Sequence, residues 1–288
     1  MAQKKVMVTG VYGLIAGAIY NHLTQFPNQY DVYGLARRQQ DSDRVAPERV
    51  LNIPDDKFKL NDLSDLDNVI EAFSGMDVVV HMAADPSGQA EWVSVLESNL
   101  IGGYNAFEAC RQAGVKRIIF ASSIQVSSGY RQEEPYSKVA RGEYDGEKPI
   151  VEHTMPTRPM NIYASSKVWG EALARTYADA HELSCLCIRI GWVVKEDRPP
   201  RLEAGDIWCS QRDIVSLTRC CIDASDEIRF DIFYGMSDNA NRWVDIAHAR
   251  RVVGYVPQDQ AEDRYLSLIH ISEPTRRYAI SYAVFCLK

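Results

Sequence analysis

The 288-residue sequence lacks clusters of basic residues, and its formal net charge is −7. Nucleic acids and acidic membrane surfaces attract clustered lysine and arginine, so this charge distribution argues against both kinds of partner. The sequence also lacks an apolar run long enough to span a membrane. Its first residues lead directly into a strand-like segment, which predicts no signal peptide. We therefore expect a cytoplasmic globular protein that acts on a small molecule.

The seven cysteines have neither the even number of a disulfide framework nor the paired spacing of a metal site. Cys185 and Cys187 lie in an apolar strand-like run, and Cys220 and Cys221 lie in a helix-like one. We expect buried, reduced thiols, as in cytosolic proteins, and no metal ion.

Strand-like and helix-like segments alternate along most of the chain, without internal repeats. This alternation predicts an α/β fold, a Rossmann-type doubly wound parallel sheet with a small C-terminal substrate lobe. We expect residues 1–265 to form one domain of this fold, with substrate-binding elements at about 124–160 and 191–245. Residues 266–288 look like translated vector sequence and are expected to be non-native. A genuine C-terminal strand and helix is the alternative.

A glycine-rich turn follows the first strand-like segment, residues 5–9. Gly10 and Gly13 permit a tight turn and let the backbone approach a pyrophosphate, whose charge the N-terminus of the next helix stabilises. Ala16 stands where a third glycine is common, and Gly17 follows it. Strand, turn and helix together predict a dinucleotide site.

Two arginines follow the second strand-like segment, residues 31–36. At this place an acidic residue accepts a hydrogen bond from the ribose 2′-hydroxyl of NAD, whereas an arginine accommodates the 2′-phosphate of NADP. Ala36 occupies the position expected for the acid, and Arg37 and Arg38 come next. The pattern favours NADP over NAD, with two solvated surface arginines as the alternative.

Two later segments are expected at the same crevice. Asp62 and Leu63 open a helix after a short strand, which places them near an adenine. The buried strand-like run at 76–84 ends in small residues that leave room for the nicotinamide ribose. His81 within this run is expected to be a packed residue rather than a catalyst.

Tyr163 and Lys167 are four positions apart in a helical segment, so both side chains lie on one helix face. An ammonium beside a phenol favours the phenolate, which otherwise forms only near pH 10. The pair therefore indicates a general base that removes a proton from a hydroxyl. An ordinary surface pair is the alternative. Ser123 ends a buried strand, where it is placed to hydrogen-bond a substrate oxygen.

With these motifs, the chain resembles the extended short-chain dehydrogenase/reductase superfamily, in its NAD(P)-dependent epimerase/dehydratase group, over roughly residues 6–265. Within the group it is most similar to the hexose C1 dehydrogenases, which include the uronate dehydrogenases and the archaeal NAD-dependent glucose-6-phosphate dehydrogenases. The segments that carry the resemblance are Asp85-Pro86-Ser87, Glu91-Trp92, Ala121-Ser122-Ser123, the run from Arg158 to Tyr163, Arg189-Ile190-Gly191, the run from Trp208 to Asp213 and the run from Tyr234 to Asn239.

The resemblance implies roles for individual residues. The catalytic residues are Ser123, Tyr163 and Lys167. The substrate-binding residues are Ser87, Ser123, Gln125, Trp192 and Arg201. The motifs and the resemblance together place the cofactor against Gly10, Tyr12, Gly13, Leu14, Ile15, Arg37, Arg38, Asp62, Leu63, Met82, Ala83, Ala84, Asn99, Tyr163, Lys167 and Ile190.

The chain departs from the family pattern near the substrate. Members often have Ser-Ser-Asn-His where this chain has Ser122-Ser123-Ile124-Gln125, so an asparagine and a histidine that would meet the sugar are missing. Trp192 replaces a small or polar residue and reshapes the pocket. Arg201 lies near the sugar's anionic group by resemblance, and a solvated loop arginine is the alternative.

The expected activity is oxidation of a sugar or sugar-acid hydroxyl, at C1 of a hexuronate or hexose phosphate, with hydride transfer to NAD(P). The alternatives are a nucleotide-sugar epimerase or dehydratase, an NADPH-dependent carbonyl reductase, and a non-catalytic dinucleotide-binding sensor or scaffold. The resemblance also implies a homodimer through helices at about 91–113 and 163–181.

Overall fold

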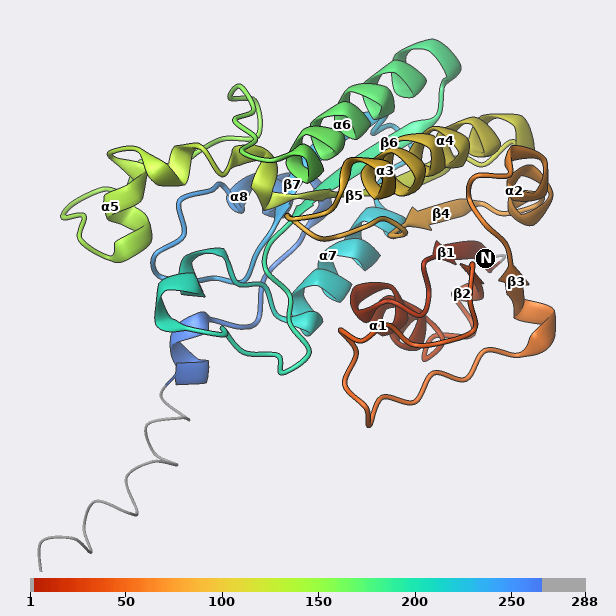
Figure 1. Ribbon diagram of the computed structural model, residues 1–288, viewed down its shortest axis with the longest axis horizontal. Helices are drawn as coiled ribbons and strands as arrows, with labels where there is room; N and C mark the ends of the chain where they lie inside the picture. Colours follow the sequence, from red (N-terminus) through yellow and green to blue (C-terminus); the bar gives the residue numbers. More distant parts are fainter. Residues whose placement is uncertain (1–2, 266–288) are drawn as a thin grey trace, which may run out of the picture.

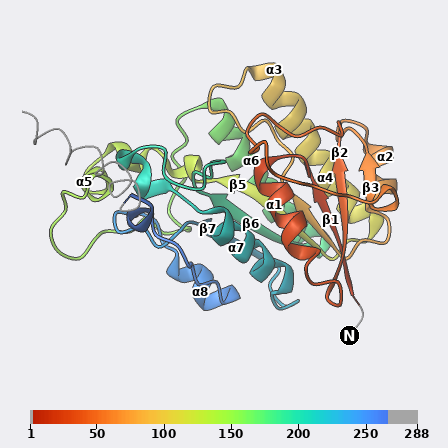
Figure 2. The ribbon, with the colours of Figure 1, turned by 90° about the horizontal axis from the view of Figure 1, so that it is seen from below.

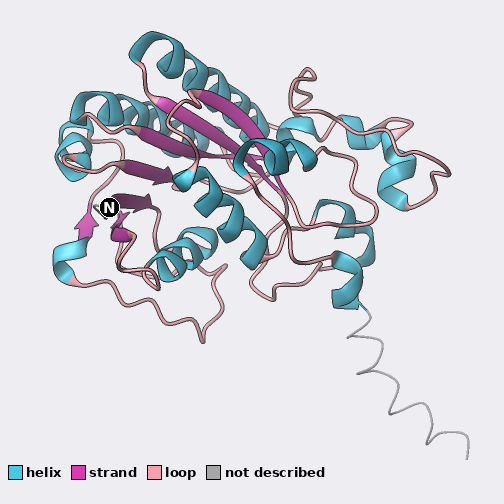
Figure 3. Cartoon of the chain, turned by 180° about the vertical axis from the view of Figure 1, so that it is seen from behind, coloured by secondary structure: helices cyan, strands magenta, loops and turns pink. Residues whose placement is uncertain are grey.

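Seven parallel strands form one sheet in the order β3-β2-β1-β4-β5-β6-β7 (Figures 1 and 3). The computed structural model describes residues 3–265, so the tail expected to be non-native, 266–288, lies outside the described residues. The strands are β1 (Lys4–Thr9), β2 (Tyr30–Ala36), β3 (Phe58–Leu60), β4 (Val78–His81), β5 (Arg117–Ser123), β6 (Ser184–Ile190) and β7 (Phe230–Gly235). The strand order reverses between β1 and β4, and this reversal opens a crevice at the carboxyl ends of the strands.

Helices cover both faces of the sheet (Figures 1 and 2). One face carries α1 (Leu14–Leu23), α7 (Gln211–Asp223) and α8 (Ala247–Val253). The other face carries α2 (Leu66–Phe73), α4 (Gly102–Ala113) and α6 (Ile162–His181). The shorter helical segments are α3 (Trp92–Val95), α5 (Tyr136–Arg141), the 3-10 turns η1 (Asp55–Lys57), η3 (Ile124–Ser127), η4 (Tyr130–Gln132) and η5 (Leu202–Ile207), and the π-helical η2 (Leu96–Ile101). The Rossmann-type prediction is confirmed.

The central strands are apolar on both sides because helices cover both faces. Every residue of β5 and of β6 is buried. Of the cysteines in the described part of the chain, Cys220 is partly buried and the others are buried, and none is disulfide-bonded. Burial raises the pKa of these thiols, as at Cys187. Among residues 3–265, no helix combines the length and the apolar character that crossing a membrane requires.

The long helix expected at 91–113 is present but not uniform. It runs as α3, η2 and α4, with a π-helical turn at Leu96–Ile101. Such wide turns inside helices often accompany functional sites. Here the turn contains Asn99, a buried residue that the sequence places at the cofactor site.

The segment between β5 and α6, which covers the substrate-binding element expected at about 124–160, contains η3, η4 and α5. Its apolar residues pack against the chain after β7 in a third buried cluster that includes Tyr130, Val139, Val151 and Trp243. Figure 2 shows α5 at the end of the molecule opposite β3. The segment between β5 and α6 and the chain after β7 therefore form a small lobe, which flanks the carboxyl ends of β5, β6 and β7.

Candidate active site

The glycine-rich turn joins β1 to α1 at the reversal point of the sheet. Gly10 has a φ of +66°, and a Cβ atom there would lie 2.9 Å from the Cα atom of Ala83. Only glycine fits this conformation and contact. The Gly13 N–H donates to the Gly10 carbonyl at 2.7 Å. Since α1 begins at Leu14, the N–H groups of Leu14 and Ile15 have no acceptor within the helix and are available to an anion.

Arg49 braces this turn from the segment after β2. Its Nη1 atom donates to the Gly13 carbonyl at 2.8 Å and its Nη2 atom to the Tyr12 carbonyl at 3.3 Å. A Cβ atom on Gly17 would lie 2.1 Å from Arg49 Nη1. The guanidinium therefore packs directly on the Gly17 backbone, and a side chain at position 17 would displace it. Arg49 lies 36 positions from Gly13 and belongs to no motif, so local sequence patterns do not indicate this contact.

A cleft of about 660 Å³ opens along this turn. This volume lies in the range of small-molecule and cofactor sites. The cleft is lined by the following residues expected at the cofactor: Gly10, Tyr12, Gly13, Arg37, Arg38, Asp62, Leu63, Ala83 and Ala84. The other expected cofactor residues lie outside this lining: Leu14, Ile15, Met82, Asn99, Tyr163, Lys167 and Ile190.

Thr9 and His81 hold the main chain of Met82 and Ala83 in place beside the cleft. Thr9 Oγ1 accepts hydrogen bonds from the N–H groups of Met82 and Ala83, both at 3.2 Å. Its own proton is then donated to His81 Nδ1 at 3.0 Å. Burial, assisted by the charge of Lys167, lowers the pKa of His81 to about 3. His81 is therefore a neutral packed residue, as expected from the sequence.

Asn99 connects the segment after β4 to the catalytic helix. Its Oδ1 atom accepts from the Asp85 N–H at 2.8 Å, and its Nδ2 atom donates to Ser166 Oγ at 3.0 Å. The structure thus gives Asn99 a positioning role within the protein.

The three expected catalytic residues come together where β5 ends and α6 begins, and all three are buried. Asn161 caps α6, because its Oδ1 atom accepts from the Ala164 N–H at 2.8 Å. The Nζ atom of Lys167 lies 5.7 Å from the centre of the Tyr163 ring. The Ser123 hydroxyl lies near enough to Tyr163 to lower the pKa of the phenol, against the larger effect of burial.

The expectation that Lys167 lowers the pKa of Tyr163 is wrong. Burial raises the pKa of Tyr163, and the hydrogen bond with Ser123 and the charge of Arg44 only partly oppose the rise. Burial also lowers the pKa of Lys167 to about 8. The four-residue spacing correctly places the two side chains together, but it carries no information on how deeply both are buried.

A buried ionic network lies behind Ser123. The guanidinium of Arg189 on β6 donates to both carboxylate oxygens of Glu171 on α6, each at 2.9 Å. Ser122 Oγ donates to the same carboxylate at 2.6 Å, and Arg189 Nη1 donates to the Tyr234 hydroxyl at 2.9 Å. The network joins α6 to β5, β6 and β7, and so fixes Tyr163 relative to Ser123.

Gln125 and Asn161 form an amide pair beside the catalytic residues. Asn161 Nδ2 donates to Gln125 Oε1 at 2.8 Å. Because Asn161 Oδ1 is used by the helix cap, the orientation of both amides is determined, and Gln125 keeps its Nε2 donor for another partner. A Cβ atom on Gly88 would lie 3.2 Å from Gln125 Oε1, so the segment with the exposed Ser87 lies next to this pair.

Comparison with known proteins agrees with this geometry. Residues 6–204 match the NAD dependent epimerase/dehydratase family. The chain belongs to this family. The resemblance inferred from the motifs is confirmed.

Relatives in this family include sugar dehydrogenases. The chain is 33% identical over 259 residues to the NAD-dependent glucose-6-phosphate dehydrogenase of Haloferax volcanii, over 90% of this chain and 94% of that protein. It is 33% identical over 201 residues to the uronate dehydrogenase of Pseudomonas putida, over 70% of this chain and 68% of that protein. The crystal structure of uronate dehydrogenase from Agrobacterium tumefaciens superposes with a TM-score of 0.76 at 27% identity, over 95% of this chain and 91% of that one.

One departure from the family pattern, Trp192, lies on the segment after β6. The main-chain N–H of Trp192 donates to the Ile207 carbonyl at 2.6 Å, and the main-chain carbonyl of Trp192 accepts from the Cys209 N–H at 3.2 Å. The guanidinium of Arg201, an exposed residue, lies 5.8 Å from the Trp192 ring centre. The two residues expected at the substrate therefore contact each other.

Proposed function

We propose that the protein is an NAD(P)-dependent dehydrogenase that oxidises the C1 hydroxyl of a hexuronate or hexose phosphate to a lactone. The observation that carries the proposal is the buried set of Ser123, Tyr163 and Lys167 at the carboxyl end of β5, next to a cleft of about 660 Å³. Relatives named as dehydrogenases of glucose 6-phosphate, L-arabinose and uronate support this reaction class.

In this mechanism, Tyr163 as phenolate takes the proton of the sugar hydroxyl. Ser123 hydrogen-bonds the same oxygen, and its hydroxyl lowers the pKa of Tyr163, which favours the phenolate. Lys167, with a pKa of about 8, is mainly protonated at neutral pH and donates to the ribose of the cofactor. When bound, the dinucleotide supplies the acceptor for the hydride from C1.

The cleft fits a dinucleotide whose pyrophosphate lies at the N-terminus of α1. The missing side chains of Gly10 and Gly13 leave room for it, and the N–H groups of Leu14 and Ile15 donate to it. Tyr12, Asp62 and Leu63 bind the adenosine half, and Met82, Ala83, Ala84, Asn99 and Ile190 bind or position the nicotinamide half.

NADP is proposed as the preferred cofactor, because β2 ends in Ala36 without a carboxylate and two arginines line the cleft after it. Each charge-assisted bond from Arg37 or Arg38 to a 2′-phosphate stabilises binding by about 1.5–3 kcal/mol. We therefore expect Arg38→Ala to raise the KM for NADP about 10- to 100-fold and to leave the KM for NAD unchanged. Steady-state kinetics with each cofactor checks this. An equal change for both cofactors would show that Arg38 does not contact the 2′-phosphate.

The reaction is tested by measuring the absorbance of reduced cofactor with a panel of hexuronates, hexose phosphates and free sugars. Reduced cofactor that accumulates in proportion to lactone supports the proposed dehydrogenase. A sugar that isomerises while no reduced cofactor accumulates identifies an epimerase. Binding of the dinucleotide without turnover of any sugar identifies a sensor or scaffold.

We propose that residues 124–160 and 191–245 form the substrate side of one catalytic unit. Gln125 donates through Nε2 to a sugar oxygen, and Ser87 hydrogen-bonds the sugar from the neighbouring segment. Arg201 binds the anionic group, with Trp192 packed beneath its guanidinium. The contact between Arg131 and Asp206, at 2.6 Å, supports this unit because it joins the two stretches of chain.

We also propose a cytoplasmic homodimer formed through α3, η2, α4 and α6. Several large apolar side chains are exposed along these helices: Trp92, Val93, Ile101, Tyr104 and Ile162. Burial of such a patch in a second copy would remove apolar surface from water. Light scattering should give twice the mass of one chain, and the mass of a single chain at assay concentration would contradict the dimer.

A further inference from the structure

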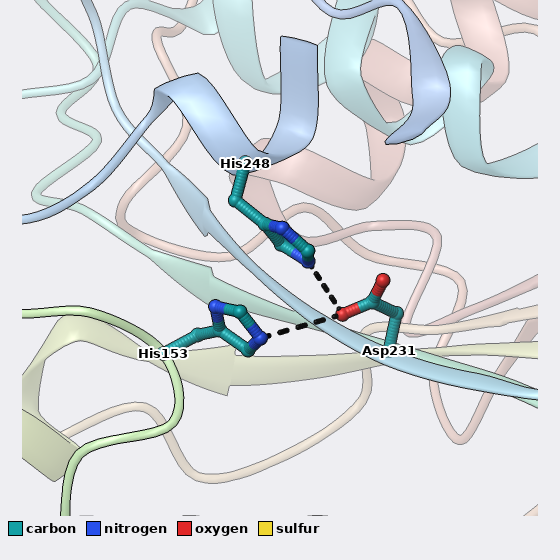
Figure 4. Close-up of side chains that lie close together, drawn as sticks. All are labelled: His153, Asp231 and His248. Atoms are coloured by element: carbon teal, nitrogen blue, oxygen red, sulfur yellow. Dashed lines mark hydrogen bonds and ion pairs between the residues drawn. The ribbon is translucent and has the colours of Figure 1, made fainter. Parts of the chain in front are cut away.

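Two histidines and an aspartate meet at the edge of the sheet (Figure 4). Asp231 lies on the edge strand β7, His248 on α8, and His153 on the segment between α5 and α6. Asp231 pairs with Leu186 near the start of β6, whereas Ser123 lies at the opposite, carboxyl end of the strands. The cluster is therefore separate from the proposed active site.

The three side chains point their polar atoms at one another, as Figure 4 shows. His248 Nε2 lies 2.8 Å from Asp231 Oδ1, and His153 Nε2 lies 3.9 Å from the same oxygen. One nitrogen from each histidine and one aspartate oxygen all lie within 4.8 Å of one another. Ligands of a tetrahedral zinc ion at about 2.1 Å from the metal are about 3.4 Å apart. The two distances to Asp231 bracket this value, and the stacked imidazole rings must turn relative to each other for both nitrogens to face one ion.

The two histidine rings of the cluster lie against each other. The imidazole rings of His153 and His248 stack with their centres 3.9 Å apart and their planes at 15°. His153 Nδ1 is buried without a hydrogen-bond partner, so hydrogen bonding does not explain why this ring is held here.

Main-chain contacts hold the cluster in place. Val151 donates to the Trp243 carbonyl at 2.8 Å and accepts from the Asp245 N–H at 3.1 Å, which brings His153 alongside the start of α8. Asp231 Oδ1 accepts a hydrogen bond from the main-chain N–H of Ile232 at 2.7 Å, which orients the carboxylate. Such outer contacts preorganise metal ligands.

We propose that His153, Asp231 and His248 bind one divalent transition-metal ion. Two imidazole nitrogens and one carboxylate oxygen match zinc best among the common divalent ions, with water in the remaining position. The ion joins β7, the segment around His153 and α8. A bound ion would thereby fasten the C-terminal lobe to the edge of the sheet.

Calorimetric titration of the chelator-treated, full-length chain with ZnCl2 tests this site. We expect about one ion per chain in the wild type, and binding at least 10-fold weaker in His153→Gln and in Asp231→Asn. His181→Gln is the matched control, because it removes an exposed histidine at the end of α6 and should bind zinc like the wild type. With CoCl2, the wild type and the control should show visible ligand-field absorption that His153→Gln lacks.

Zinc should also raise the thermal midpoint of the wild type and of the control, because the site exists only in the folded chain. If Asp231→Asn fails to fold, His153→Gln alone tests the zinc site. This variant preserves the hydrogen bond between His248 and Asp231. Equal zinc affinity in the wild type and in His153→Gln, or no zinc binding by the wild type, would overturn the proposal.

Discussion

Tyr163→Phe is expected to lower kcat about 100- to 10,000-fold, the contribution of a general base to a proton transfer. The substitution removes one buried hydroxyl and leaves the ring in its place at the start of α6. The KM for the dinucleotide should change little, since the glycine-rich turn and the cleft are untouched. Steady-state kinetics and cofactor titration measure the two effects separately.

A variant that retains near wild-type turnover would remove Tyr163 from the mechanism. The wild type offers a second check, because burial raises the pKa of Tyr163 and the phenolate is then the minor form at neutral pH. Since oxidation requires the phenolate, kcat at saturating cofactor should increase as the pH rises. A rate that is independent of pH would exclude this proton transfer from the slow step.

Glu171→Gln is expected to lower the free energy of unfolding by about 3–5 kcal/mol, because it leaves the guanidinium of Arg189 buried without a counter-charge. The side chains of Arg189 and Glu171 are 2% and 6% exposed, so water cannot replace the lost carboxylate. Urea denaturation followed by circular dichroism measures the change, provided that the m-value stays constant.

The matched control is Asp179→Asn, which breaks the ion pair of Asp179 with Arg175 on the same helix. These side chains are 60% and 58% exposed, so the pair contributes at most about 1 kcal/mol. Equal losses in the two variants would show that the buried network does not determine the stability of α6. A selective loss in Glu171→Gln would show that the helix carrying Tyr163 is fixed through this network.

The features that the sequence predicted depend on short spacings. Gly10 and Gly13 indicate the turn, and the strand-helix alternation indicates the sheet, because hydrophobic periodicity and glycine conformations are local properties. Tyr163 and Lys167 share a helix face for the same reason. All of these elements lie where the local patterns place them.

The features that were missed depend on contacts between distant segments. Arg189 meets Glu171 from a different element, and Asn161 orients Gln125 from 36 positions away. His153, Asp231 and His248 lack any metal-binding spacing, so the sequence predicted no metal ion there. The direction of the Tyr163 pKa shift was wrong because burial is a property of the assembled core.

The contact between Gly17 and Arg49 links the first turn of α1 to the segment after β2. The guanidinium occupies the space that a side chain at position 17 would need, since a Cβ atom there would lie 2.1 Å from Nη1. A larger residue at position 17 would push the flexible end of Arg49 aside and break its hydrogen bonds to the carbonyls of Tyr12 and Gly13. The loop before α1 would then have to keep its shape without these two bonds.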